Sequence, residues 1–266
     1  MVDALKDKPQ PFLQWVGGKR TVAKQLIEHI PTNLNNYYEP FLGGGALFFQ
    51  VKQMFKKCFL SDINLELITT YNAVKKNPET VGALLEEYNS KHSKEYYYKV
   101  RNVSNSSHPD NISARFLYLT RYAFKGIYRL NKKGSNVSSF AYKTYKTSRI
   151  HNRLKDCSSL LNNVSIYATD FSFIEPQQND FVYFDPPYHK AGEKFYTRLP
   201  FDENEQIRLR DFTEMLTCKG VKIMVSNSDT KFIRDIYKDF NINTIDVKYS
   251  LPDKREKLQE LMITNY

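Results

Sequence analysis

The stretch Phe-Val-Tyr-Phe-Asp-Pro-Pro-Tyr at residues 181–188 decides the fold. Its four leading residues are apolar or aromatic and predict a short buried strand. That strand must end at the two prolines, because proline donates no ladder hydrogen bond and fixes its own φ angle. Asp185 precedes a proline and is therefore held in an extended conformation. The stretch predicts a rigid stub, with a carboxylate, two free carbonyls and an aromatic ring at a strand's carboxyl end, where open α/β sheets bind ligands.

The groups of this stub, residues 185–188, suit an exocyclic amine on a flat ring. The lone pair of such an amine is delocalised into the ring, so the nitrogen is a poor nucleophile. Hydrogen bonds from the amine to Asp185 and to the Pro186 carbonyl would favour a more tetrahedral nitrogen, and Tyr188 could stack on the ring. The alternative is an ordinary buried strand that ends in a proline turn, with Asp185 as a helix cap.

Two glycine turns precede the stub, and each comes before a predicted helix. The first spans residues 17–19 ahead of an amphipathic helix at 22–30, and the second ends the segment 39–45 ahead of a helical run at 46–55. The first lacks P-loop spacing and the second lacks the dinucleotide fingerprint, which disfavours a dinucleotide-dependent oxidoreductase. Another predicted strand ends at Asp62, about twenty residues beyond the second turn, where an acid can bind ribose hydroxyls. Together these elements predict a site for an adenosine-type ligand.

The middle of the chain interrupts this α/β pattern. Residues 63–76 and 79–124 are predicted to be helical, the second segment with a polar, Ser/Asn-rich interruption at 104–111. We expect leucines and aromatic residues of this second segment to form a small separate core. A cationic stretch with Gly, Asn and Ser punctuation follows at 124–149. It predicts either a solvated basic loop or a nucleic-acid contact surface with interleaved tyrosines.

Regular α/β alternation resumes after the basic stretch. We expect helices at 149–161, 202–218 and 230–240, strands at 165–171 and 221–226, and a closing strand pair at 242–247 and 261–266. His189, in the loop after the stub, is expected to be solvated. These elements predict an α/β protein with one sizeable core and an insertion.

Composition narrows the class of protein. A formal charge of +10 and a sequence pI near 9.3 favour a polyanionic partner, although a merely soluble basic protein fits the charge equally well. The three cysteines form no C-x-x-C pair and the histidines are scattered, so we expect no disulfide framework and no metal site. No secretory signal or membrane span is visible in the sequence. We therefore expect a cytoplasmic protein in a reducing compartment.

The combined motifs resemble those of a known family. F-x-x-W-x-G-G-K-R, E-P-F-x-G-G-G, a strand ending in Asp and D-P-P-Y occur here in the order of the Dam-type (D12 class, α-group) adenine-N6 DNA methyltransferases. The resemblance implies a Rossmann-like sheet that binds S-adenosylmethionine, with an inserted helical target-recognition domain. It assigns residues 1–70 and 160–266 to the catalytic domain and residues 71–159, with a basic hairpin, to the insert.

The resemblance also assigns roles to residues at matched positions. The cofactor contacts it implies are Trp15, Lys19, Glu39, Phe41, Asp62, Asp170, Phe171 and Asp185. The contacts it implies with a flipped target adenine are Asp185, Pro186 and Tyr188. Those it implies with DNA are Arg129 as a guanine reader, Asn131, Lys132, Lys133 and Ser138. One departure lies downstream of the hairpin, where Asn136-Val137-Ser138-Ser139 replaces the family's usual F-N-V-P, so the full target sequence is left open.

The implied reaction is direct methyl transfer from S-adenosylmethionine to adenine N6 in duplex DNA, with GATC or a related site as the leading target. Methylation of an RNA base or a glutamine side chain is one alternative, although such enzymes more often have Asn in place of Asp185. A catalytically silent DNA-binding relative is the other. Double-stranded DNA is the expected partner, a cognate restriction endonuclease is a candidate partner, and no obligate protein partner or membrane is expected.

Overall fold

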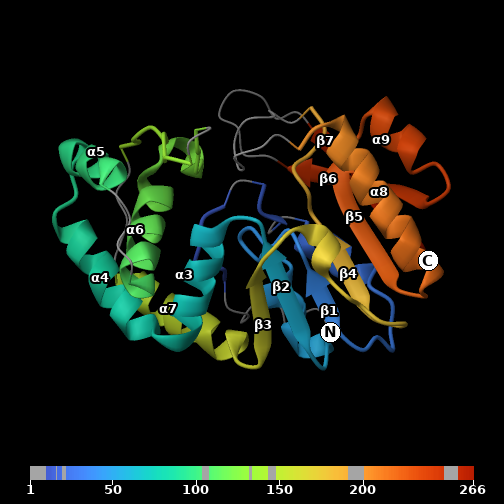
Figure 1. The fold of residues 1–266 in the computed structure, drawn as a ribbon, viewed down its shortest axis with the longest axis horizontal. Helices are drawn as coiled ribbons and strands as arrows, with labels where there is room; N and C mark the ends of the chain where they lie inside the picture. The colour runs from blue at the N-terminus through green and yellow to red at the C-terminus, as the bar shows by residue number, and fades with distance from the viewer. Residues whose placement is uncertain are drawn as a thin grey trace.

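A computed structural model describes residues 10–15, 17–19, 22–103, 108–131, 134–142, 148–190, 201–248 and 257–266. A seven-stranded sheet with the order β3-β2-β1-β4-β5-β7-β6 organises these residues (Figure 1). The strands in chain order are β1 (Tyr37–Glu39), β2 (Cys58–Asp62), β3 (Val164–Ala168), β4 (Phe181–Phe184), β5 (Lys222–Ser228), β6 (Asn241–Lys248) and β7 (Lys257–Thr264). The expected α/β class is confirmed.

The strand order reverses between β1 and β4. Strands β1, β2 and β3 follow one another toward one edge of the sheet, whereas β4 pairs with the other side of β1 and leads to β5. These five strands are parallel, and β7 runs antiparallel between β5 and β6, which confirms the closing strand pair. A reversal of this kind opens a crevice at the carboxyl ends of the strands on either side of it.

The central strand β4 is buried on both faces, as its apolar run predicts. Successive side chains of a strand point to opposite faces. Phe181 and Tyr183 join the apolar cluster on one face, and Val182 and Phe184 join the cluster on the other. On this second face, α8 (Glu203–Cys218) and α9 (Lys231–Ile236) pack through Leu209, Leu216 and Ile233. The first face is covered by α1 (Ala23–Glu28), α2 (Phe48–Val51), α3 (Leu65–Lys76) and α7 (Ser148–Leu161).

Three helices between α3 and α7 form the left-hand part of the molecule in Figure 1. They are α4 (Pro78–Ser90), α5 (Lys94–Asn102) and α6 (Pro109–Tyr122). Proline at the first helical position favours the starts of α4 and α6, and Ser93 caps α5 by accepting the N–H of Tyr96. The expectation of a separate core for this segment is wrong. Leu85 and Phe116 belong to the same buried cluster as Tyr37 of the sheet, because α3 packs against both α6 and β3.

Two predicted elements differ in extent or type from the expectation. The strand expected at 165–171 stops at Ala168, because Asp170 accepts the N–H of Ser172 and caps a 3-10 turn. The helix expected at 46–55 is a single α-turn followed by the 3-10 turn Lys52–Met54. Side-chain capping and tight turns therefore set boundaries that apolar periodicity alone does not.

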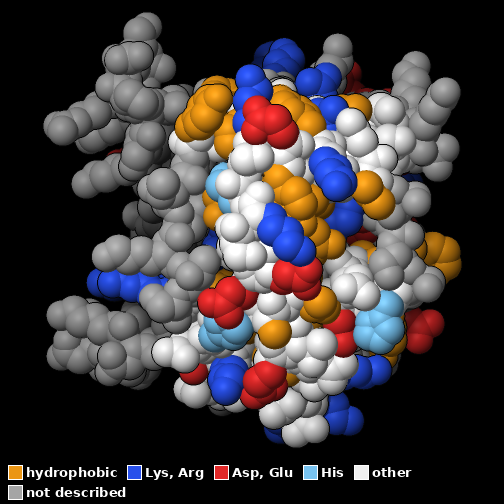
Figure 2. All heavy atoms as spheres, turned by 90° about the vertical axis from the view of Figure 1, so that its left-hand side faces the viewer, with side chains coloured by type: hydrophobic (Ala, Val, Ile, Leu, Met, Phe, Trp, Pro, Cys, Tyr) orange, Lys and Arg blue, Asp and Glu red, His pale blue; other side chains and the backbone are white. Residues whose placement is uncertain are grey.

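The outer face of α4–α6 carries charges of both signs. Figure 2 shows Lys, Arg, Asp and Glu side chains interspersed over the described part of this face, together with apolar side chains. The net charge of +10 is therefore not displayed there as a uniform basic field. Within the described ranges, no helix is long and apolar enough to cross a bilayer.

Candidate active site

Acidic side chains meet at the edge where the parallel strands end. Glu39 closes β1, Asp62 closes β2, and Asp185 follows β4 directly. Asp170 comes shortly after the end of β3. Because parallel neighbours end at the same edge of a sheet, the fold brings four predicted carboxylates to one edge, around the β1/β4 reversal.

Asp185 is paired with a cation from the first glycine turn. The Nζ of Lys19 lies 2.8 Å from Asp185 Oδ1 and donates a 2.7 Å hydrogen bond to the carbonyl of Gly17. Lys19 is only 5% exposed, so water screens the pair weakly. Burial raises the pKa of Asp185, and the charge of Lys19 opposes that rise. The turn therefore places a positive charge beside the carboxylate of the stub.

Tyr188 contacts both this cation and a second carboxylate. The Nζ of Lys19 lies over the ring, 4.6 Å from its centroid, and the Tyr188 hydroxyl donates a 2.7 Å hydrogen bond to Glu260 Oε2. Glu260 lies on β7 and is buried. The ring is thus held at its face by one distant segment and at its hydroxyl by another.

Two buried amides hold the backbone of the stub from α8 and β5. Gln206 Nε2 donates to the carbonyl of Pro187 at 2.8 Å, and Gln206 Oε1 accepts from Asn227 Nδ2 at 2.9 Å. Asn227 Oδ1 accepts the backbone N–H of His189 at 3.1 Å. The expectation of two free carbonyls is therefore wrong for Pro187, because the α8 amide occupies its oxygen.

His189 is buried, so the expectation of a solvated loop histidine is also wrong. Its Nδ1 lies 2.8 Å from Thr230 Oγ1, and its Nε2 lies 3.1 Å from Glu203 Oε1. Ser228 Oγ donates to its carbonyl at 2.6 Å. These partners belong to later elements of the chain, and together they anchor the segment that leaves the stub.

The second glycine turn is packed between Trp15 and Asp62. Gly43 has a φ of 46°, and a Cβ placed on it would lie 2.8 Å from Trp15 Cδ1, so only glycine fits this position. Its backbone N–H donates a 3.0 Å hydrogen bond to Asp62 Oδ2. Burial raises the pKa of Asp62 to about 6, against the lowering effect of backbone hydrogen bonds from Asn64 and Gly43. Three residues predicted from separate motifs are therefore brought into direct contact.

Glu39 is the most deeply buried acid of the site. It is 2% exposed and accepts a 2.7 Å hydrogen bond from the Tyr37 hydroxyl. Burial raises its pKa to about 8, and the nearby charge of Asp185 adds to the rise, while Tyr37 and Lys19 oppose it. A cationic ligand group near Glu39 would lower this pKa and stabilise the ionised carboxylate. At neutral pH the Glu39 carboxyl is therefore mostly protonated, and binding of a cationic group beside it would release a proton.

Asp170 and Phe171 are organised by an arginine that the sequence motifs do not include. Arg208 of α8 contacts Asp170 with two nitrogens, each at 2.8 Å, and its guanidinium lies 4.0 Å from the centroid of the Phe171 ring. Hydrogen bonds from Arg208 lower the pKa of Asp170 to about 2. Phe41 stacks on Phe171 with ring centroids 5.3 Å apart. The carboxylate is thus ionised and fixed, beside a pair of stacked rings.

The hairpin residues 128–138 follow α6 and the 3-10 turn Phe124–Gly126. The side chain of Arg129 is exposed, while its backbone N–H donates to Ser138 Oγ at 2.9 Å. Asn131 Oδ1 closes the turn by accepting the N–H of Ser135 at 2.9 Å. Ser138 is only 3% exposed, which contradicts its expected contact with DNA. Lys132 and Lys133 lie outside the described residues.

Aromatic packing joins this hairpin, through Trp15, to the second glycine turn. Tyr128 stacks on Trp15 with centroids 6.5 Å apart and contacts Phe116 of α6 at 4.7 Å. Trp15 in turn packs on Gly43. A continuous set of rings therefore connects the residues beside Arg129 with the glycine turn at the end of β1.

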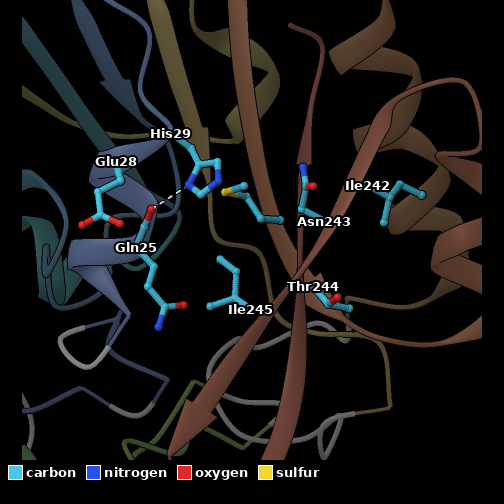
Figure 3. A pocket seen from close by; sticks show the side chains of 8 residues that line it. Gln25, Glu28, His29, Ile242, Asn243, Thr244 and Ile245 are labelled. Carbon is cyan, nitrogen blue, oxygen red and sulfur yellow. Dashed lines mark hydrogen bonds between the residues drawn. The ribbon is translucent and has the colours of Figure 1, made fainter.

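One cavity of the described chain lies apart from this site. A cavity of about 350 Å³ lies between α1 and the β6–β7 pair, where His29 Nδ1 contacts the carbonyl of Gln25 at 2.8 Å (Figure 3). Its lining combines polar and apolar side chains without a cluster of ionisable groups that faces a common point. Among the described residues, no group of three or more His, Cys, Asp or Glu side chains could hold a metal ion.

Sequence reasoning missed the residues that support the site. Gln206, Arg208, Asn227 and Glu260 lie outside the motifs that predict the site. The one available signal for Glu260 is an acid placed directly before the apolar run 261–263 of a predicted strand. A charge in such a position requires a buried partner, which the sequence alone does not name.

Comparisons with known proteins agree with this geometry. Residues 15–251 match the family described as D12 class N6 adenine-specific DNA methyltransferase. The chain is 38% identical to the type II methyltransferase M1.LlaDCHI of Lactococcus lactis subsp. cremoris, covering 97% of this chain and 95% of that protein. It is 37% identical to M.MjaIII of Methanocaldococcus jannaschii, with 97% and 99% covered, and 32% identical to a DNA adenine methylase of Haemophilus influenzae, with 97% and 94% covered. The chain therefore belongs to the D12 class of N6 adenine-specific DNA methyltransferases.

Proposed function

We propose that this enzyme transfers a methyl group from S-adenosylmethionine to the N6 of an adenine that is flipped out of duplex DNA, at GATC or a related site. The observation that carries the proposal is the stub itself. Its carboxylate and aromatic ring lie at the β1/β4 reversal, held by Lys19, Glu260 and Gln206. A rigid carboxylate can accept a hydrogen bond from an aromatic amine while a rigid aromatic ring beside it stacks on the ring that carries the amine.

The residues around the glycine turns fit S-adenosylmethionine. Glu39 is a buried acid at the end of β1 that can accept hydrogen bonds from a ligand, and Asp62 ends β2 beside the turn that Gly43 forms. The proposed cofactor contacts are Trp15, Lys19, Glu39, Phe41, Asp62, Asp170, Phe171 and Asp185. When bound, the cofactor supplies an electrophilic methyl group on a positively charged sulfur.

Asp185 and the Pro186 carbonyl would accept hydrogen bonds from the adenine amine and orient its lone pair. Lys19 Nζ lies 2.8 Å from Asp185 Oδ1 and holds the carboxylate in place for this contact. A carboxylate cannot deprotonate a neutral aromatic amine in advance, so Asp185 orients the nitrogen and accepts the proton after methylation has made it acidic. Base extrusion costs about a few kcal/mol, and stacking on Tyr188, worth roughly 1–3 kcal/mol, offsets part of it.

The segment 71–159 would recognise the target sequence. The exposed Arg129 can make two hydrogen bonds to the major-groove edge of guanine. Asn131, Lys132 and Lys133 would contact the DNA beside it, and Ser138 would hold the hairpin in shape. The names of the two type II relatives support a role in restriction–modification, in which methylation protects sites from a cognate endonuclease.

The test is to incubate plasmid DNA with the protein and S-adenosylmethionine and to sequence the methylated adenines. We expect methylation at one short motif, and Asp185→Ala should abolish it while duplex affinity stays within a few fold, because phosphate contacts dominate affinity. Asp211→Ala, an exposed acid on α8, is the matched control and should retain activity. Methylation of structured RNA but not DNA, or substantial turnover by Asp185→Ala, would overturn the proposal.

A further inference from the structure

A buried carboxylate on β7 lies next to the stub. Glu260 is 6% exposed and is followed on the strand by three buried apolar residues, Leu261, Met262 and Ile263. In the sheet it pairs with Ser228 of β5 on one side and Ile245 of β6 on the other. A carboxylate so placed is unfavourable unless polar partners compensate for its lost hydration. One such partner is the hydroxyl of Tyr188, at 2.7 Å.

We propose that Glu260 is a positioning residue for the methyl-transfer reaction and that it acts by fixing the ring of Tyr188. The inference rests on the proposed function, in which Tyr188 stacks on the target adenine. Glu260 itself does not contact the base in this scheme. Its carboxylate accepts the Tyr188 hydroxyl and thereby sets the orientation of the stacking surface.

The two ends of Tyr188 are fixed by different means. The Pro186-Pro187 pair stiffens the backbone before it, and Gln206 holds the Pro187 carbonyl at 2.8 Å. These contacts locate the Cα atom but leave the side-chain torsions free. The hydrogen bond to Glu260 lies at the far end of the side chain, where it restrains both torsions at once. Without it, the side chain would keep its interaction with Asp185 and the contact of its ring with Lys19 Nζ, which lies 4.6 Å from the centroid and restrains orientation weakly.

The charge of Glu260 also suits this task. Burial raises the pKa of Tyr188 well above its usual value, and the neighbouring charges of Asp185 and Glu260 add to the rise. The phenol therefore remains a hydrogen-bond donor throughout the working pH range. An acceptor that cannot donate, such as an ionised carboxylate, is the matching partner for such a phenol.

The position of Glu260 inside the sheet gives the hydrogen bond to Tyr188 a rigid support. Strand β7 lies inside the sheet, between β5 and β6, and β5 also supplies Asn227, which supports Gln206 and the segment after the stub. The ring of Tyr188 and the backbone of the stub are therefore both held by contacts with the adjacent strands β5 and β7. A positioning residue on such a frame holds geometry better than one on a loop.

The test uses the full-length protein and a duplex that contains one target site. Glu260→Leu should lower kcat about tenfold or more, with the KM for S-adenosylmethionine within about twofold of wild type. Glu260→Gln keeps an acceptor oxygen and should recover part of the loss. Glu214→Gln, an exposed acid on α8, is the control and should behave as wild type.

A double-mutant cycle with Tyr188→Phe identifies the route of the effect. If Glu260 acts through the Tyr188 hydroxyl, Tyr188→Phe should lower kcat by a similar factor, and adding Glu260→Gln to it should cause little further loss. Additive losses would show that Glu260 acts elsewhere and would overturn the inference. Circular dichroism melts show whether each variant is folded. If Glu260→Leu is unfolded, the cycle of the conservative variants Glu260→Gln and Tyr188→Phe decides the question.

A spectroscopic readout separates positioning from general stability. With 2-aminopurine in place of the target adenine, a fixed Tyr188 ring should quench the flipped base by stacking, so Glu260→Leu should raise the emission of the bound duplex. Unchanged emission and unchanged kcat in all Glu260 variants would overturn the inference while wild-type methylation still supported the proposed function. A wild-type protein that methylates no DNA would instead refute the proposed function itself.

Discussion

At the scale of single residues, the site contains acids whose ionisation the fold controls. Asp170 is held ionised by Arg208, with its pKa lowered to about 2, whereas burial raises the pKa of Glu39 to about 8. Two carboxyl groups at the same edge of the sheet, after β1 and after β3, therefore have opposite pKa shifts. The difference has two causes: burial removes water from Glu39 and outweighs the hydrogen bond from Tyr37, whereas hydrogen bonds from Arg208 stabilise the ionised form of Asp170.

The raised pKa of Glu39 predicts a measurable pH dependence. Between its ordinary value near 4.5 and its folded value near 8, the folded protein binds more protons than the unfolded chain, so stability falls as pH rises through this window. Glu39→Gln resembles the neutral acid and keeps an acceptor for the Tyr37 hydroxyl. Its melting temperature should match wild type below about pH 4.5 and exceed it by an increasing margin up to about pH 8, by roughly 2–4 °C for each kcal/mol. Fluorimetric melts across this range check the prediction, and a pH-independent difference would contradict it.

Asp62 gives a second prediction at this scale, for cofactor affinity. If its carboxylate binds the ribose hydroxyls, Asp62→Ala should weaken S-adenosylmethionine binding by about 1.5–3 kcal/mol, the range for a hydrogen bond to a charged group. Loss of the bond to the Gly43 N–H contributes to the same effect, because the glycine turn loses its restraint. Calorimetry provides the measurement. Asp235→Ala on α9 is a control with a distant acid, and equal affinities for wild type and Asp62→Ala would remove Asp62 from the cofactor site.

At the scale of elements, the hairpin residues 128–138 are the part of the described chain best suited to reading a base. Gly134 has a φ of 81°, and Asn131 Oδ1 accepts the N–H of Ser135, so the described residues 131 and 134–135 fix where the chain turns back. The backbone of Arg129 is fixed by Ser138 while its side chain is exposed. The arm therefore presents a cation from a fixed backbone.

Arg129→Ala should relax the preference for guanine beside the target adenine by about 1–3 kcal/mol, the range for a bidentate contact with a base. Its effect on binding to unrelated duplex should be smaller, because phosphate contacts there are many. Arg234→Ala on α9 removes the same charge from another element and is the control. Sequencing of methylated genomic DNA from expressing cells gives the neighbours of each modified adenine. A motif without guanine 5′ of the adenine would contradict both GATC and the role of Arg129.

At the scale of the whole molecule, the charge of +10 bears on association with DNA. Affinity for non-target duplex should fall steeply between roughly 50 and 200 mM salt, by about a thousandfold or more if six or more phosphates are contacted. Fluorescence anisotropy at several salt concentrations gives the slope. Affinity for S-adenosylmethionine, measured alongside, should change by only a few fold, since the cofactor site is buried rather than an open charged surface. A flat response of DNA binding would show that the net charge is incidental.

The ring contacts between the hairpin and the glycine turn were not visible from the sequence. Tyr128, Trp15 and Gly43 belong to three separate segments, and their contact depends on how α6 packs beside the sheet. The same is true of the single buried cluster that joins α4–α6 to the sheet, where two cores were expected. Periodicity identifies apolar faces but does not say which faces meet.

From the sequence alone, we could predict the features that depend on backbone sterics and on the alternating direction of side chains along a strand. Proline ends β4 and fixes the stub, and glycine permits the positive φ of the turn at Gly43. Because side-chain directions alternate along a strand, Phe181 and Val182 lie on opposite faces of the sheet. The sequence also placed Asp62 and Asp185 at strand ends. Which groups surround the stub depends on the tertiary structure. It pairs Lys19 with Asp185 and hydrogen-bonds Glu260 to Tyr188 and Gln206 to the Pro187 carbonyl. It also buries His189. These contacts join residues that are distant in the chain, and a buried polar group is stable only with a partner, which packing supplies and local sequence does not specify.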